Sequence, residues 1–147
     1  MKLAKAVLIG AVLAAGAVYA QAERTDPNSI ARSELMKING KNVGILSDMA
    51  GGKAAYDAAA AEAAKAALVE AAGKIEATFK DQGAADPASR AKPEIWANWD
   101  DFLMKAKALG DGAAALDVAS AESIGAGLGA IGGACKDCHT TYQMPKE

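Results

Sequence analysis

Residues 55–80 read AYDAAAAEAAKAALVEAAGKIEATFK, and alanine dominates this stretch. Alanine is the strongest helix former, and the stretch lacks the alternation of apolar and polar residues that is typical of a strand. We therefore predict a helix over about 54–80 in an all-α protein. Its larger side chains are sparse, so that neighbouring helices can approach closely: Tyr56, Leu68, Ile75 and Phe79.

A second helix is predicted upstream, from Pro27 or Asn28 to Met49. The sequence DPNS at 26–29 offers capping residues and a proline suited to a first turn, and AGGK at 50–53 marks the end. The dipeptide NG at 39–40 is a turn signal, but no alternating strands flank it, so we expect a continuous helix. Spacings of four, three and four residues place one group on a single face: Arg32, Met36, Asn39 and Val43.

Two further helices are predicted downstream. The segment 81–94, DQGAADPASRAKPE, is a connector with two prolines and a glycine. The next helix runs from near Pro93 to Leu109, and we expect GDG at 110–112 to end it. The last helix starts between Leu116 and Glu122 and runs to about Tyr142. Four helices with short connections predict an antiparallel up-down four-helix bundle.

The last helix carries an apolar stripe that ends in cysteine and histidine. Five glycines lie between 125 and 133, and each costs about 1 kcal/mol relative to alanine in a helix. We expect them to let something bulky approach the backbone. The stripe repeats every three or four residues: Ile124, Leu128, Ile131, Cys135, then Cys138 or His139, and Tyr142.

The motif CKDCH at 135–139 contains both cysteines and the single histidine of the chain. On a helix, Cys135, Cys138 and His139 point the same way. Cys-x-x-Cys-His is the attachment motif of a c-type haem, with two thioether bonds and an imidazole ligand to iron. A thioredoxin-like redox pair would need a βαβ context, which is absent from the pattern. A zinc site would need a fourth ligand, from Asp137 or Glu147.

The N-terminus has the form of a secretory signal peptide. Lys2 and Lys5 precede an apolar run of about 15 residues, which is short of the ~20 needed to span a bilayer. We expect cleavage after Ala22, which leaves one domain at 23–147 in the periplasm and not embedded in a membrane. The whole chain has a formal net charge of −2, and removing two lysines makes it −4. This acidic balance argues against nucleic-acid binding.

Three further segments accompany GGACKDCHTTY at 132–142 and make the sequence resemble the class II c-type cytochromes, the cytochrome c′ family with its low-spin His/Met relatives. The stretch ARSELMKINGKNVGILSDMAGG at 31–52 is similar to the first helix of that family. AYDAAAA at 55–61 and KPEIWANWDDF at 92–102 are similar to its second and third helix starts. The resemblance extends over the mature chain and implies a four-helix bundle with one haem c beside the C-terminal helix.

The resemblance also implies residue roles. Cys135 and Cys138 match the thioether positions, and His139 matches the proximal axial ligand. Arg32 matches an arginine that meets a haem propionate, and Met36 matches the residue facing the open side of iron, as a sixth ligand or as a cover. The remaining predicted cofactor contacts are Ser33, Phe79 and Arg90.

Gln143 departs from the pattern, because many cytochromes c′ carry a basic residue four positions after the axial histidine. A pocket of Met36 and aliphatic side chains would offer no proton donor, which disfavours peroxidase chemistry, so we expect no enzymatic activity. The prediction is electron transfer, with NO or CO binding as an added role. The alternative is a five-coordinate protein that sequesters NO and carries no electrons. The family also implies a homodimer formed by the first two helices.

Overall fold

The computed structural model describes residues 23–145, which form helices joined by short loops and one longer linker. The predicted signal peptide lies outside the described residues. None of the helices in the described part is long and apolar enough to cross a membrane. The elements are α1 (Pro27–Ala50), α2 (Ala58–Gly73), α3 (Ile75–Phe79), α4 (Glu94–Ala97), α5 (Trp99–Ala115) and α6 (Ala121–Tyr142).

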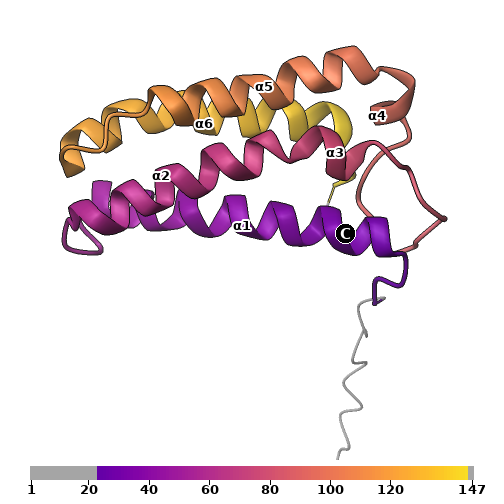
Figure 1. Cartoon of the computed structure of the whole chain (residues 1–147), viewed down its shortest axis with the longest axis horizontal. Coiled ribbons are helices and arrows are strands. Elements are labelled where there is room, and N and C mark those ends of the chain that lie inside the picture. Colours follow the sequence, from indigo (N-terminus) through magenta and orange to yellow (C-terminus); the bar gives the residue numbers. More distant parts are fainter. Residues whose placement is uncertain (1–22, 146–147) are drawn as a thin grey trace, which may run out of the picture.

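The four long helices form the antiparallel four-helix bundle that the sequence predicts (Figure 1). Around the bundle, α1 packs against α2 and α6, and α5 packs against the same two helices. The short helices α3 and α4 flank the linker at one end. The largest apolar side chains that the bundle buries fully are Leu46, Leu68, Ile95, Leu116, Ile124 and Ile131.

Helix α1 confirms the prediction of one continuous helix through Asn39 and Gly40. The Asp26 side chain caps it by accepting a hydrogen bond from the Ser29 backbone N–H at 2.8 Å. The helix ends at Gly51, and Gly52 has a φ of 70°, a conformation that favours glycine. The expected end signal at 50–53 is therefore confirmed.

The predicted helix over 54–80 is two helices. The first begins only at Ala58, because Asp57 caps it by accepting a hydrogen bond from the Ala60 N–H at 2.8 Å. A break at Lys74 then separates α2 from α3. The alanine-rich composition predicted helix correctly, but it did not reveal the cap or the interruption.

Helix α5 corrects the prediction that GDG ends the third helix at Leu109. A separate turn, α4, comes first, and α5 then continues through both glycines to Ala115. A Cβ atom at Gly112 would lie 3.5 Å from the side chain of Ile131, so α5 and α6 pack closely there. Buried Leu109 and Ala113 hold this turn in the core, and tertiary packing overrides the low helix propensity of glycine.

The glycines of α6 do not make room for a cofactor, contrary to expectation. At Gly127 a Cβ atom would lie 2.5 Å from Cδ1 of Leu116, so this glycine admits a side chain of the protein itself. Gly129, Gly132 and Gly133 meet nothing within 4 Å, and none of the five lines the main cavity. The apolar stripe itself is confirmed, because Ile124, Ile131 and Tyr142 are buried.

The linker between α3 and α4 is tied to both ends of the chain. Asp86 accepts hydrogen bonds from the backbone N–H groups of Thr25 and Asp26 at 3.0 and 3.1 Å. Ala91 forms an isolated antiparallel bridge with Gln143 just beyond α6. The linker is thereby held across the end of the bundle, where it closes one side of the cavity described below.

Candidate functional site

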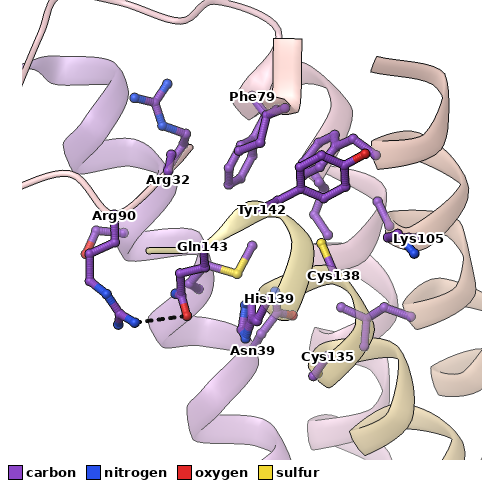
Figure 2. A pocket seen from close by; sticks show the side chains of 18 of the residues that line it. Arg32, Asn39, Phe79, Arg90, Lys105, Cys135, Cys138, His139, Tyr142 and Gln143 are labelled. Atoms are coloured by element: carbon purple, nitrogen blue, oxygen red, sulfur yellow. Dashed lines mark hydrogen bonds between the residues drawn. The ribbon is translucent and has the colours of Figure 1, made fainter. Parts of the chain in front are cut away.

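A cavity of about 620 Å³ lies between α1, α5, α6 and the linker (Figure 2). Cofactor sites commonly have volumes of about 300–1,000 Å³. All eight residues that the sequence analysis predicts as cofactor contacts line this cavity: Arg32, Ser33, Met36, Phe79, Arg90, Cys135, Cys138 and His139.

Helix α6 presents Cys135, Cys138 and His139 to this cavity from adjacent turns. A capping box starts the helix, because the Ser120 and Ser123 side chains each accept a hydrogen bond from the other residue's backbone N–H at 3.0 Å. The last turn ends at Tyr142, directly after the motif. Regular helix over the whole motif therefore gives the three groups one common direction.

Both thiols are half-buried and stay protonated at neutral pH. Burial raises the pKa of Cys135, and it raises the pKa of Cys138 to about 11. Redox-active and metal-binding cysteines use the thiolate and have lowered pKa values. Residues 23–145 also contain no group of three or more His, Cys, Asp or Glu side chains placed to hold a metal ion. Within this part of the chain the geometry thus gives no support to the thioredoxin-like or zinc alternatives, and Glu147, one of the two candidate fourth zinc ligands, lies outside the described residues.

His139 lies at the cavity with an exposed side chain. Partial loss of hydration lowers the pKa of its imidazole, and the nearby positive charge of Arg90 lowers it further. Both effects favour the neutral imidazole. This is the form that coordinates iron, through the lone pair of a ring nitrogen.

Arg90 is fixed beside His139 by the last residues of the chain. Its Nε and Nη2 atoms donate to the Met144 carbonyl at 2.9 and 2.6 Å, and Nη2 also donates to Oε1 of Gln143 at 3.2 Å (Figure 2). Gln143 brings no charge to this position, but it helps to hold a cation that comes from the linker. The sequence alone gave no sign that these two residues, 53 positions apart, would meet.

Arg32 is 5% exposed and binds the linker. Its Nη1 and Nη2 atoms donate to the backbone carbonyls of Asp81 and Gln82 at 3.0 and 3.2 Å. The guanidinium also lies over the ring of Trp96 at 5.3 Å. Burial lowers the arginine pKa, and the charge of Asp26 opposes this effect. Among the described residues Nε has no partner, and Nη1 and Nη2 each use one of their two N–H groups in these bonds, so N–H groups remain for the predicted propionate contact.

The charged side chains that line the cavity are all basic: Arg24, Arg32, Lys37, Arg90 and Lys105. No aspartate or glutamate of residues 23–145 is among the lining residues. Such a cavity suits a large apolar group that carries negative charge. Haem has this character, with an apolar ring and two propionates, so the side chains fit a haem c.

Two other lining residues, which were not predicted as site residues, also affect the chemistry of the cavity. Lys105 comes from α5 and lies near enough to Cys138 for its charge to lower the thiol pKa, against the dominant effect of burial. Asn39 comes from α1, and both polar atoms of its buried amide lack a hydrogen-bond partner. The sequence could have predicted Asn39 as a site residue, because its spacing places it on the same helix face as Arg32 and Met36. The cavity therefore contains an uncharged hydrogen-bond donor, but an amide is not an acid, so the absence of a proton donor beside Met36 stays a prediction.

Comparison with known proteins gives one consistent family. The family model described as Cytochrome C' matches residues 29–143. A "Cytochrome c-556" of Agrobacterium fabrum is 34% identical over 99% of this chain and 97% of that protein. A "Cytochrome c'" of Cereibacter sphaeroides is 31% identical over 95% and 98%. A solved cytochrome c' of Rhodobacter "Spheriodes" superposes with a TM-score of 0.74 at 30% identity and covers 81% of this chain and 96% of that one.

Proposed function

Because this chain belongs to the cytochrome c′ family and is a monohaem c-type cytochrome, we propose that it carries single electrons in the periplasm. The haem is attached through Cys135 and Cys138, and His139 is the proximal ligand. The observation that carries this proposal is the convergence of both thiols, the imidazole and Met36 on one basic-rimmed cavity.

Haem supplies an iron that changes by one electron. The chain's own residues set its surroundings. His139 offers a neutral imidazole, and Arg90 keeps a positive charge beside it, which favours the reduced iron. Phe79 and Phe102, with ring centroids 5.1 Å apart, shield the cavity wall from water. A site of this kind changes its charge with little rearrangement, as an electron carrier requires.

Met36 is the residue that would either bind the iron of a haem in this cavity or leave it open to another ligand. It lies on α1, across the cavity from α6, and is half-buried. A thioether bond to iron would give His/Met ligation, which raises the potential and suits electron transfer. With a single histidine in the chain, no second imidazole is available for acid/base catalysis, and we propose no enzymatic activity.

A second candidate function is binding of NO or CO. One solved relative is the nitric oxide complex of a mutant of cytochrome c prime from Alcaligenes xylosoxidans. It has a TM-score of 0.71 at 26% identity, covering 81% of this chain and 94% of that one. The buried, unpaired amide of Asn39 in the cavity favours this candidate further, because it could contact a polar ligand. In this case Met36 would cover the iron without binding it.

Visible absorption of the reduced protein before and after addition of CO separates the two functions. Electron transfer through His/Met ligation predicts a sharp low-spin spectrum that CO leaves unchanged. A broad Soret band that shifts with CO would exclude a Met36–iron bond and favour gas binding. Replacement of His139 by alanine should abolish the normal spectrum in either case, and an unaltered spectrum would refute its assignment as ligand.

The proposed location follows from the predicted leader. We propose export and cleavage after Ala22, which leaves 23–147 as the mature domain. N-terminal sequencing of the protein recovered from the periplasmic fraction of a bacterial host would test this, and a mature chain that retains Met1 would contradict it.

We also propose a homodimer that buries the outer faces of α1 and α2. Ile30 and Ile38 on α1 and Val69 on α2 are large apolar side chains exposed to solvent. Ile38→Glu should convert the dimer to a monomer in sedimentation equilibrium. Met104→Glu, at an exposed position on α5, is the matched control and should leave the dimer intact.

A further inference from the structure

Asn39 is an anomaly in the core of α1. Its side chain is 5% exposed, and among residues 23–145 neither Nδ2 nor Oδ1 has a hydrogen-bond partner. Buried amides are nearly always paired, because leaving one unpaired forfeits its hydration without compensation. An unpaired amide that lines a cavity therefore indicates a partner that enters the cavity from outside the polypeptide.

Asn42 shows that α1 can satisfy a buried asparagine by itself. This residue is 9% exposed, and its Nδ2 donates to the carbonyl of Ile38, four residues earlier, at 2.8 Å. Asn39 makes no equivalent bond to Leu35. The difference is one of direction, since Asn39 lines the cavity and Asn42 does not.

The position of Asn39 limits what it can meet. It lies three residues after Met36 on the same face of α1, and both residues line the cavity to which α6 contributes His139. Beyond Met36, α1 contributes Lys37, Asn39, Gly40 and Val43 to the lining. Lys37 is exposed and pairs with Glu34 at 2.6 Å. The amide of Asn39 is thus the buried polar group that α1 offers in this part of the cavity.

We propose that the Nδ2–H group of Asn39 donates a hydrogen bond to a small diatomic ligand, such as CO or NO, held on the α1 side of the haem. This inference rests on the proposed haem site with His139 as proximal ligand. It assigns ligand recognition to Asn39, in addition to the covering role of Met36. A donor at this position favours ligands whose outer atom can accept a hydrogen bond.

The test is the infrared C–O stretching band of the reduced holoprotein with CO, measured in a Met36→Ala background. This background opens the iron whether or not the native methionine binds it, so the result does not depend on which proposed function holds. A hydrogen bond to the outer oxygen increases electron donation from iron into CO and lowers the stretching frequency. Asn39→Leu, of similar size, should therefore shift the band to higher wavenumber.

Asn39→Gln keeps an N–H donor and should retain a band near that of the parent. Asn42→Leu is the matched control and should not move the band, because it removes an equally buried amide outside the cavity. Circular dichroism verifies that each variant is folded. An Asn39→Leu band at the parent position, an equal shift with Asn42→Leu, or failure of the Met36→Ala protein to bind CO would each overturn the proposal.

Discussion

Tyr142 joins the end of the haem-binding helix to α5. Its hydroxyl donates to Oδ2 of Asp101 at 2.6 Å, and its ring packs edge-on against Phe102 with centroids 5.5 Å apart. Because Tyr142 lies three residues after His139, these contacts fix the turn of α6 that carries the imidazole. Burial, followed by the hydrogen bond to Asp101, raises the tyrosine pKa to about 12.

We expect Tyr142→Phe to lower the free energy of unfolding by about 1–3 kcal/mol at neutral pH, since it leaves Asp101 without this donor. The pKa is raised on folding, so the contribution is complete below the unfolded value near 10 and is lost as the pH rises toward 12. Guanidinium titrations between neutral pH and about pH 12 should show that the difference in unfolding free energy between wild type and the variant shrinks as the pH rises. Tyr56→Phe removes the hydrogen bond from an exposed tyrosine to the Val118 carbonyl, and it should lower the free energy of unfolding by less at neutral pH.

At the scale of the elements, α6 contains glycines with opposite consequences. Gly127 faces Leu116, a fully buried side chain, whereas Gly129 faces open space on the same helix. The first is required by close packing, and the second only weakens the helix. Sequence composition cannot separate them, because both lie in the same run of small residues.

This contrast gives a matched pair of substitutions. Gly127→Ala should destabilise the protein by about 1–3 kcal/mol, because the new Cβ displaces Leu116 in a packed core. Gly129→Ala should stabilise it by about 0.5–1 kcal/mol, because alanine restricts the unfolded chain and favours helix. Thermal unfolding of the two holoproteins measures both changes. Equal shifts in Tm would show that α6 does not pack here as described.

At the scale of the whole molecule, segments distant in sequence meet at the open end of the bundle (Figure 1). The start of α1, the linker and the C-terminal residues are joined there through Asp26, Asp86 and Arg90. A positive φ of 72° at Gly83 lets the linker pass close to Asp26, where a Cβ atom would lie 2.5 Å from the carboxylate. These ties bring Arg90 to His139.

The linker ties should make stability sensitive to acid. Desolvation acts to raise the pKa of Asp86, but backbone N–H donors from Ala88, Asp26 and Thr25 outweigh it and lower the pKa. Its contribution is therefore present above the unfolded pKa of about 4 and is lost as the pH falls below that value. Asp86→Ala should be less stable than wild type at neutral pH, and the difference should shrink in acid.

Circular dichroism during acid titration measures this difference, and limited proteolysis of 81–93 reports release of the linker. Asp111→Ala is a suitable control, because Asp111 pairs with Lys107 within α5 and does not touch the linker. A linker equally protected in both variants would contradict the role given to Asp86.

The sequence by itself determined the class of fold and the position of the haem-binding motif. Helix propensity and the spacing of Cys135, Cys138 and His139 are local properties. The structure accordingly has a helix, α6, that presents all three side chains to the cavity. Helical periodicity likewise places Arg32 and Met36 on one face of α1, whereas the predicted contacts at Ser33, Phe79 and Arg90 were implied by the resemblance to the cytochrome c′ family.

Only the tertiary structure decided the features that depend on contacts between elements. It continued α5 through two glycines, because burial outweighs propensity, and it interrupted the alanine-rich helix at Lys74. It also brought Arg90 beside His139 and left Asn39 buried without a partner. Hydrogen-bond satisfaction and electrostatics depend on what faces a side chain, and in this bundle most of those neighbours come from elements far away in the chain.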